Sequence, residues 1–189
     1  MNVDGIRCLI AGGARGLGAA LALDLAERGA DLALSYHSSA RQADETCAAV
    51  RALGRRCVTL RVDLADADDA GRLVERAAAE LGGLDALVYC ASGPFVPQRP
   101  DELDEAAWRA SLDTIAKGFF FTAQAAHRAF TVGVGKSGPE NVGPERGPVP
   151  ATVSERTDAE PPPGQETTRG VIVAITDVGG EAPWAAFAA

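Results

Sequence analysis

The sequence predicts an α/β fold in which helices pack against a parallel sheet, and three observations support this. Short apolar runs alternate with longer segments of helical periodicity up to about residue 130, as in successive βαβ units. The chain has 189 residues, which suits one domain of ordinary size. Hydrophobic residues make up 47% and charged residues 23%, a balance typical of globular proteins. We therefore expect residues 1–189 to form a single domain.

Five apolar runs are the strand candidates. The first four cover residues 6–11, 32–36, 57–62 and 84–91. The fifth, residues 170–176 (GVIVAIT), is continuous and rich in β-branched residues. Because strands covered on both faces have this composition, we expect the fifth strand to be buried on both sides.

Three segments between the first four runs carry apolar residues at helical spacing, and each is expected to lie on a face of the sheet. Asp66 precedes the third segment, where a short acidic side chain can cap free amides. The apolar stripes are Leu17, Leu21 and Leu25 in the first, Ala43, Cys47 and Val50 in the second, and Ala70, Leu73, Val74, Ala77 and Leu81 in the third.

A fourth helix, the longest, is predicted from about Asp104 to Phe130. Apolar residues recur along it every three or four positions, so it must pack on a broad surface. The stripe consists of Trp108, Leu112, Ile115, Phe119, Thr122, Ala126 and Phe130.

The segment 131–169 has a different composition. It holds seven of the eleven prolines and no aromatic residue, so it lacks the apolar surface that would offset chain ordering. We expect a flexible or polyproline-like insert within the domain. A solvated loop is favoured over a partner-binding segment, because a proline-rich loop alone is weak support for binding.

Charge and cysteine content exclude several classes of protein. Acidic residues outnumber basic ones by 26 to 18, and no basic patch is found that would bind nucleic acid or an anionic membrane. The four cysteines have no paired spacing of the zinc kind, so no metal site is expected and they are interpreted as buried free thiols. The chain shows no export signal and no apolar run of membrane-spanning length, so a cytoplasmic location is expected.

A glycine-rich turn follows the first predicted strand. Gly12, Gly16 and Gly18 lie where strand gives way to helix, in the stretch AGGARGLG. Glycine allows a tight turn there and lets the backbone approach a pyrophosphate, whose charge meets the free amides of the helix. Glycine needed for packing alone is the alternative, but the strand–turn–helix setting favours nucleotide binding.

From this turn onward the chain resembles the short-chain dehydrogenase/reductase family, with Ala11 where the family usually has Thr. Its reductase branch, including 3-oxoacyl-carrier-protein reductases, is the most similar. Four further matches follow in order along the chain. Asp63-Leu64 resembles the pair that contacts adenine, and YCASG (with Cys90, Ala91 and Ser92) stands at the Asn-Asn-Ala-Gly position. The stretch WRASLDTIAKGFFFTAQ is similar to the long fourth helix, and residues 172–189 are similar to the strand and loop of the catalytic serine.

This resemblance implies a Rossmann-like, doubly wound parallel sheet of about five strands in the order 3-2-1-4-5. It also implies that the chain stops before the last helix and strands of the family fold. The fifth strand would then form a sheet edge, and an apolar stripe of the fourth helix would lose its cover. We accordingly expect a marginally stable or self-associating protein, with homo-oligomers forming through the helix around residues 104–130.

The resemblance also implies a cofactor, and we expect NADP(H) in preference to NAD(H). Tyr36 stands where NAD-preferring members place an Asp, whose charge would repel a 2′-phosphate. His37, Ser38 and Ser39 offer donors, and Arg15 offers a fixed positive charge. The alternative is that these are solvated surface groups. The expected cofactor-binding residues are Gly12, Arg15, Gly16, Leu17, Gly18, Tyr36, His37, Ser38, Asp63, Leu64, Cys90, Ala91 and Ser92.

The catalytic residues that the family uses are not matched. Ile115 stands at the position of the family's Asn, and Asp177, with Thr176 beside it, stands at that of the Ser. An ionised carboxylate would repel the developing alkoxide, so Asp177 would have to be protonated, or Thr176 would act instead. The family's Tyr-x-x-x-Lys pair would fall beyond Ala189.

Two functions are therefore kept open. One is a short-chain-type oxidoreductase that acts on a small carbonyl or alcohol with NADP(H). The other is a non-catalytic protein that binds a dinucleotide or a partner.

Overall fold

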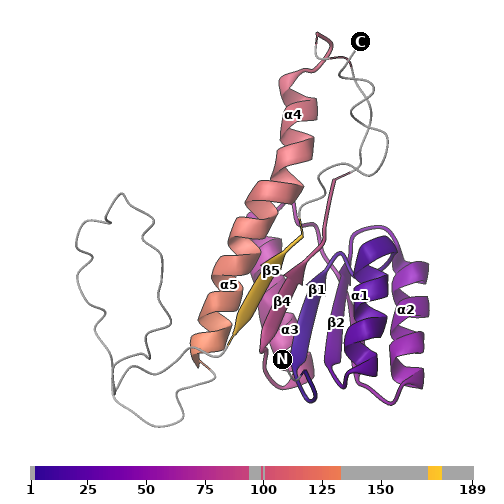
Figure 1. The fold of residues 1–189 in the computed structure, drawn as a ribbon. Helices are drawn as coiled ribbons and strands as arrows, with labels where there is room; N and C mark the ends of the chain where they lie inside the picture. The colour runs from indigo at the N-terminus through magenta and orange to yellow at the C-terminus, as the bar shows by residue number, and fades with distance from the viewer. Residues whose placement is uncertain (1–2, 94–98, 100, 133–169, 176–189) are drawn as a thin grey trace, which may run out of the picture.

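The computed structural model describes residues 3–93, 99, 101–132 and 170–175, and in them a five-stranded parallel sheet lies between two layers of helices (Figure 1). The strand order is β3-β2-β1-β4-β5, which confirms the predicted order and the doubly wound fold. The strands are β1 (Arg7–Ala11), β2 (Asp31–Tyr36), β3 (Cys57–Arg61), β4 (Ala86–Tyr89) and β5 (Val171–Ala174).

Helices connect successive strands as the sequence predicts. Helices α1 and α2 cover one face of the sheet, whereas α3 and α5 cover the other (Figure 1). The helical elements are α1 (Gly16–Glu27), α2 (Ala40–Ala52), α3 (Ala67–Leu81), α4 (Glu105–Leu112), the π-helical turn η1 (Asp113–Lys117) and α5 (Gly118–Val132).

Two hydrophobic clusters, one on each face of the sheet, form the core. Successive residues of a strand point to opposite faces, so Leu9 packs against α3 and α5 whereas Cys8 and Ile10 pack against α1 and α2. Leu9 and Ile10 have no exposed surface. The central strands are thus covered on both sides, which explains their continuous apolar sequence.

The predicted helix faces hold for α2 and α3, where every residue of the predicted stripes is buried. Asp66 caps α3, because its Oδ1 accepts a hydrogen bond of 2.8 Å from the amide of Asp69. The stripe predicted for α1 holds only in part: Leu25 packs against the core, whereas Leu17 is 55% exposed. The most buried residues of this helix are the small ones, Ala22 and Ala26.

The predicted single helix from Asp104 to Phe130 is interrupted by η1. Its second half packs on α3 and buries Thr122, Ala126 and Phe130, as the stripe predicts. Its first half extends beyond the sheet (Figure 1) and leaves Trp108 and Leu112 exposed. One continuous apolar stripe therefore has two environments.

The fifth strand is not buried on both faces. It forms the edge of the described sheet beyond β4, and Val171, Ile172 and Val173 are each about 40% exposed. The prediction from composition was wrong, because the composition of a strand does not report its position within a sheet. The other expectation, an edge strand beside a helix with an uncovered apolar stripe, agrees with the described residues.

The predicted insert falls largely outside the described residues. The predicted insert begins at residue 131, but α5 continues to Val132, and residues 133–169 lie outside the described part.

The four cysteines are free thiols, with Cys90 only partly buried. None of the described helices is both long and apolar enough to cross a bilayer.

An ion-pair cluster fastens the amino-terminal edge of the sheet. Asp31, at the start of β2, accepts bonds of 3.0 Å from the Arg56 amide and 2.8 Å from its Nε, and pairs with Arg55 at 2.9 Å. Burial alone would raise the pKa of Asp31, but the hydrogen bonds from Arg56 and the two guanidinium charges outweigh it and lower the pKa below the usual value of 3.8.

We predict that Asp31→Asn lowers the free energy of unfolding by about 1–3 kcal/mol at pH 7, because the guanidinium groups lose their charged acceptor. A carboxylate with a lowered pKa contributes stability above its unfolded pKa and loses it as the pH falls through the folded pKa. The difference between wild type and variant should therefore shrink below about pH 4. Urea unfolding followed by circular dichroism measures both values.

The matched control is Asp24→Asn, because Asp24 pairs with Arg28 at 2.9 Å in an exposed position. It should leave stability unchanged within error. A loss for Asp31→Asn that is the same at pH 7 and pH 3 would contradict the ion-pair explanation.

Candidate functional site

The candidate site lies at the carboxyl edge of the sheet, where the glycine turn joins β1 to α1. The turn touches the chain after β4: a Cβ added to Gly12 would lie 2.9 Å from the Cα of Ala91. A Cβ at Gly18 would overlap the carbonyl oxygen of Gly12. Gly12 also has a φ of 82°, which favours glycine. Two of the three predicted glycines are thus required by contact with neighbouring backbone.

Ser35 holds the turn from β2. Its Oγ accepts a hydrogen bond of 3.1 Å from the amide of Gly12, and its carbonyl accepts one of 3.1 Å from Gly13. Its side chain is fully buried. Thr46 on α2 adds a bond of 3.2 Å from its hydroxyl to the carbonyl of Ala14. Sequence analysis missed both residues, although a serine inside the apolar run LALSY was a visible signal.

The first amides of α1 follow this turn, and no acceptor for them is found among the described residues. Because Ser35 takes the amides of Gly12 and Gly13, the next available donors are those of Gly16, Leu17 and Gly18, which precede the first helical hydrogen bond. These amides and the helix dipole favour an anion. Leu17 is 55% exposed, and its amide is one of these donors.

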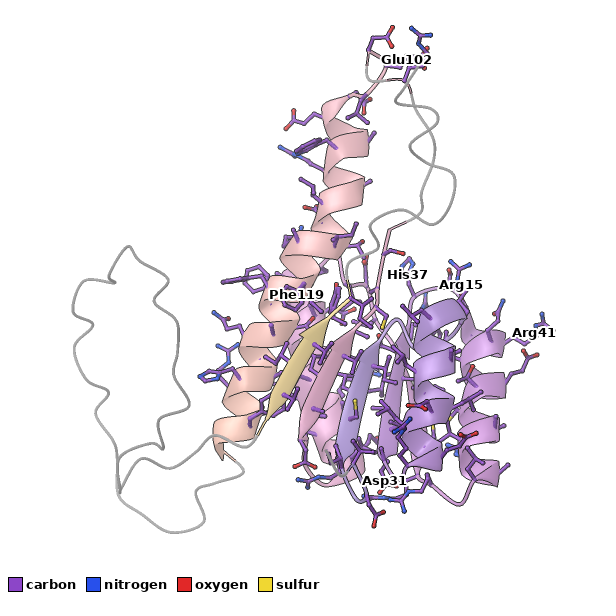
Figure 2. All side chains as sticks on the ribbon, in the orientation of Figure 1. Arg15, Asp31, His37, Arg41, Glu102 and Phe119 are labelled. Carbon is purple, nitrogen blue, oxygen red and sulfur yellow. The ribbon has the colours of Figure 1, made fainter. Side chains whose placement is uncertain are left out.

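Arg15 precedes these amides and is exposed. Within the described residues it takes part in no ion pair, so its charge is available at this edge of the sheet. Figure 2 shows its side chain on the same edge as His37.

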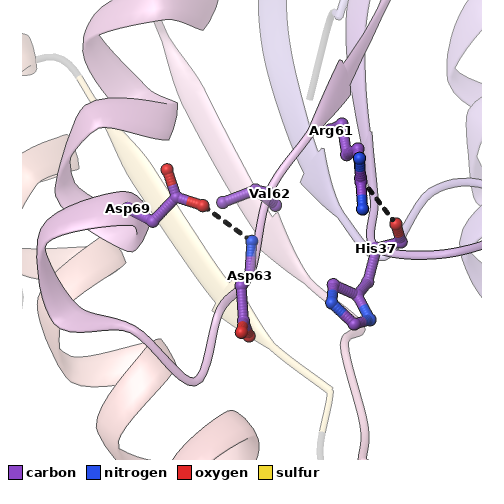
Figure 3. A pocket seen from close by; sticks show the side chains of 5 residues that line it. All are labelled: His37, Arg61, Val62, Asp63 and Asp69. Atoms are coloured by element: carbon purple, nitrogen blue, oxygen red, sulfur yellow. Dashed lines mark hydrogen bonds between the residues drawn. The ribbon is translucent and has the colours of Figure 1, made fainter.

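A hollow of about 420 Å³ lies at the same edge of the sheet, between the ends of β2 and β3 and the start of α3. Figure 3 shows Arg61 and His37 on one side of it, with the Arg61 Nε donating to the His37 carbonyl over 3.4 Å. Asp63 and Asp69 stand opposite, and Asp69 accepts a bond of 2.8 Å from the Asp63 amide. The structure thus brings the predicted residues His37 and Asp63 to one hollow.

The other predicted cofactor residues surround this edge. Tyr36 ends β2, and its carbonyl accepts a bond of 2.9 Å from Val62. Ser38 and Ser92 are exposed, and Leu64 is buried and packs in the core. Cys90 donates its amide to the carbonyl of Ala11 over 2.8 Å, and burial raises the pKa of its thiol.

The predicted catalytic positions are described only in part. Ile115 lies in the π-helical turn η1 and is 39% exposed, with no group that could hydrogen-bond a ligand through its side chain. The buried hydroxyl of Tyr89 donates to the carbonyl of Thr114 in the same turn. Burial raises the pKa of Tyr89, so this phenol stays neutral. Thr176 and Asp177 lie outside the described residues.

No metal centre is found among the residues that the structure describes, since no three His, Cys, Asp or Glu side chains gather there. The amides and guanidinium groups at this edge are of the kind that suits a phosphorylated ligand.

Comparisons with known proteins show which family the chain resembles. The family model for short chain dehydrogenases matches residues 7–138. Cis-4-hydroxycyclohexanecarboxylate dehydrogenase of Sinomonas cyclohexanicum is 43% identical over 106 residues, which are 56% of this chain and 41% of that protein. Hydroxynaphthalene reductase arp2 of Aspergillus fumigatus is 38% identical over 121 residues, or 63% and 44%. The chain thus spans less than half the length of these curated relatives.

Solved structures show the same likeness. A short chain dehydrogenase from Burkholderia cenocepacia in complex with NADP has a TM-score of 0.65 at 39% identity, over 68% of this chain and 52% of that one. A putative dehydrogenase from the same organism with bound NADP has a TM-score of 0.64 at 35% identity, over 67% and 49%.

We predict that Ser35→Ala loosens the glycine turn, because the Gly12 amide loses its acceptor. The variant should lose about 1–2 kcal/mol of stability. Hydrogen exchange of the Gly12 amide should quicken, whereas the Gly13 amide, bonded to the Ser35 backbone carbonyl, keeps its protection. Exchange followed by NMR measures both. Ser38→Ala, at an exposed serine, is the control, and an unchanged Gly12 rate would contradict the role of Ser35.

Proposed function

The chain belongs to the short-chain dehydrogenase/reductase family, and from this we propose that it binds NADP(H) for hydride transfer to or from a small carbonyl or alcohol. The observation that supports this best is the glycine turn, whose free amides and neighbouring Arg15 form a site for phosphate at the carboxyl edge of the sheet. The reaction class is supported by relatives that are named as a dehydrogenase and a reductase of hydroxylated compounds.

The residues present fit a dinucleotide. Gly16 has a φ of 56° and open space where a Cβ would stand, so the backbone of the turn is free to approach a pyrophosphate there. The amides of Gly16, Leu17 and Gly18 would bind its oxygens. The hollow beside Asp63 would take the adenosine end.

A preference for NADP(H) over NAD(H) follows from charge. Tyr36 ends β2 where a carboxylate would repel a 2′-phosphate, and His37, Ser38 and Ser39 follow it. Arg15 supplies a positive charge that no carboxylate in the described residues neutralises. The two Burkholderia structures described with NADP support the same choice.

The chemical step proposed is hydride transfer. NADP(H), when bound, supplies the hydride donor or acceptor. Negative charge then develops on the substrate oxygen, which Thr176 or a protonated Asp177 could stabilise by donating a hydrogen bond. Ile115 cannot replace the hydrogen-bonding asparagine of the family.

A non-catalytic function is the second candidate, and Ile115 favours it. This residue lies in η1, partly exposed, where the family has a polar side chain. Such a protein would keep the nucleotide site and use it for binding alone. Nucleotide binding without turnover of any ketone would support this candidate.

Self-association through the α4 side is also proposed, together with a cytoplasmic location suited to the free thiols. Trp108, Leu112 and Ile115 follow one another at helical spacing and are 56%, 38% and 39% exposed. A second copy could cover this stripe.

We predict that Arg15→Ala raises the dissociation constant for NADPH about tenfold and that for NADH less than about twofold, because only NADPH carries the 2′-phosphate. Titration calorimetry and nucleotide fluorescence measure both constants. Arg28→Ala, at the other end of α1, is the charge-matched control. Absence of binding by the folded wild type to either nucleotide would overturn the proposed function, and equal losses for both would overturn the NADP(H) preference.

We also predict that Trp108→Glu shifts the protein towards monomer, because a carboxylate opposes burial of the stripe. Sedimentation velocity at several concentrations measures the shift. Glu105→Gln, an exposed change on the same helix, should leave it unaltered. A wild-type protein that is already monomeric at high concentration would contradict this contact.

A further inference from the structure

Arg61 lies near the proposed coenzyme site but has no role in the proposed function. It is the last residue of β3 and lies beside Tyr36, the last residue of β2, in the sheet register. Its side chain is exposed and lines the hollow together with His37 (Figure 3). The end of β2 therefore has Arg61 on one side.

Arg15 stands on the other side of that strand end. Strand β2 lies between β1 and β3, and Arg15 follows β1 in the glycine turn. Because all three strands are parallel, their carboxyl ends meet at one edge. Two guanidinium groups thus come from the strands on either side of His37.

The guanidinium of Arg61 makes one long hydrogen bond within the described residues. Its only described acceptor is the His37 carbonyl, reached by Nε over 3.4 Å, so the terminal nitrogens keep their donors. Arg7, by contrast, is fixed by two bonds of 2.8 Å to Asp85. A structural role would fasten Arg61 in the same way.

The carboxylates of the hollow do not neutralise Arg61. Asp69 accepts from the Asp63 amide and lies 3.6 Å from Arg72, whereas Asp63 accepts from the Ala65 amide over 2.9 Å. In the described residues neither forms an ion pair with Arg61. One side of the hollow is thus acidic and bound to backbone, and the other side is cationic.

We propose that Arg61 is a specificity-determining residue that binds the 2′-phosphate of NADP(H) from the β3 side, opposite Arg15. This inference rests on the proposed function and adds a residue to it. The planar guanidinium suits phosphate oxygens through paired N–H donors. A ligand with only hydroxyls on that ribose gains little from the charge, so Arg61 discriminates between the two coenzymes.

The test uses the full chain and two pairs of ligands. NADPH is compared with NADH, and adenosine 2′,5′-bisphosphate with ADP, by titration calorimetry. Arg61→Gln should raise the dissociation constants of the two 2′-phosphorylated ligands about tenfold and those of the other two less than about twofold. Arg61→Lys should lie between, and the salt dependence of NADPH binding should be shallower in Arg61→Gln.

Arg76→Gln is the matched control. Arg76 lies on α3, and its Nη1 donates to the Arg61 carbonyl over 3.0 Å. Its side chain does not line the hollow. The variant therefore removes the same charge close to the site, while the glutamine keeps a hydrogen-bond donor. Its NADPH affinity should stay within about twofold of wild type.

Several outcomes would overturn the inference. Unchanged NADPH affinity in Arg61→Gln, while Arg15→Ala still weakens it, defeats the role of Arg61 and leaves the proposed function intact. Equal weakening of all four ligands means that Arg61 contacts the adenine ring instead of the 2′-phosphate. Equal losses in Arg61→Gln and Arg76→Gln mean a long-range charge effect. Wild type that binds neither coenzyme overturns both proposals.

Discussion

The close approach of the glycine turn to the end of β4 is the constraint on which the rest of the site depends. Gly12 lies against Ala91 with no room for a side chain, and Ser35 fixes the turn from β2. Three strands therefore set the position of one short segment. This arrangement places the start of α1 at the carboxyl edge of the sheet, where its amides and the helix dipole favour a phosphate.

The two edges of the sheet use charge in different ways. At the amino edge, Arg7 is paired with Asp85, and Asp31 with Arg55 and Arg56, so the charges serve stability. At the carboxyl edge, Arg15 and Arg61 have no carboxylate partner among the described residues. A chain with a net charge of −8 thus presents local positive charge where an anionic coenzyme would bind.

The long helix shows how the same pattern serves two purposes. Around Ala126 it packs on α3 and completes the core, whereas around Trp108 its stripe is exposed beyond the sheet. Between these two parts lies η1, where the Thr114 carbonyl accepts a hydrogen bond from the Tyr89 hydroxyl. The same turn contains Ile115. The exposed stripe and β5 thus leave apolar surface uncovered by the described residues.

The sequence by itself determined the strand and helix order, the cap at Asp66 and the glycine turn, because these depend on local periodicity and on residues close in the chain. Only the tertiary structure decided that Leu17 faces solvent, that β5 is an edge and that Ser35 holds the turn. It also placed Arg61, an ordinary charged residue in the sequence, beside His37. Such relations join residues distant in the chain, and local pattern holds no information on which strand ends meet.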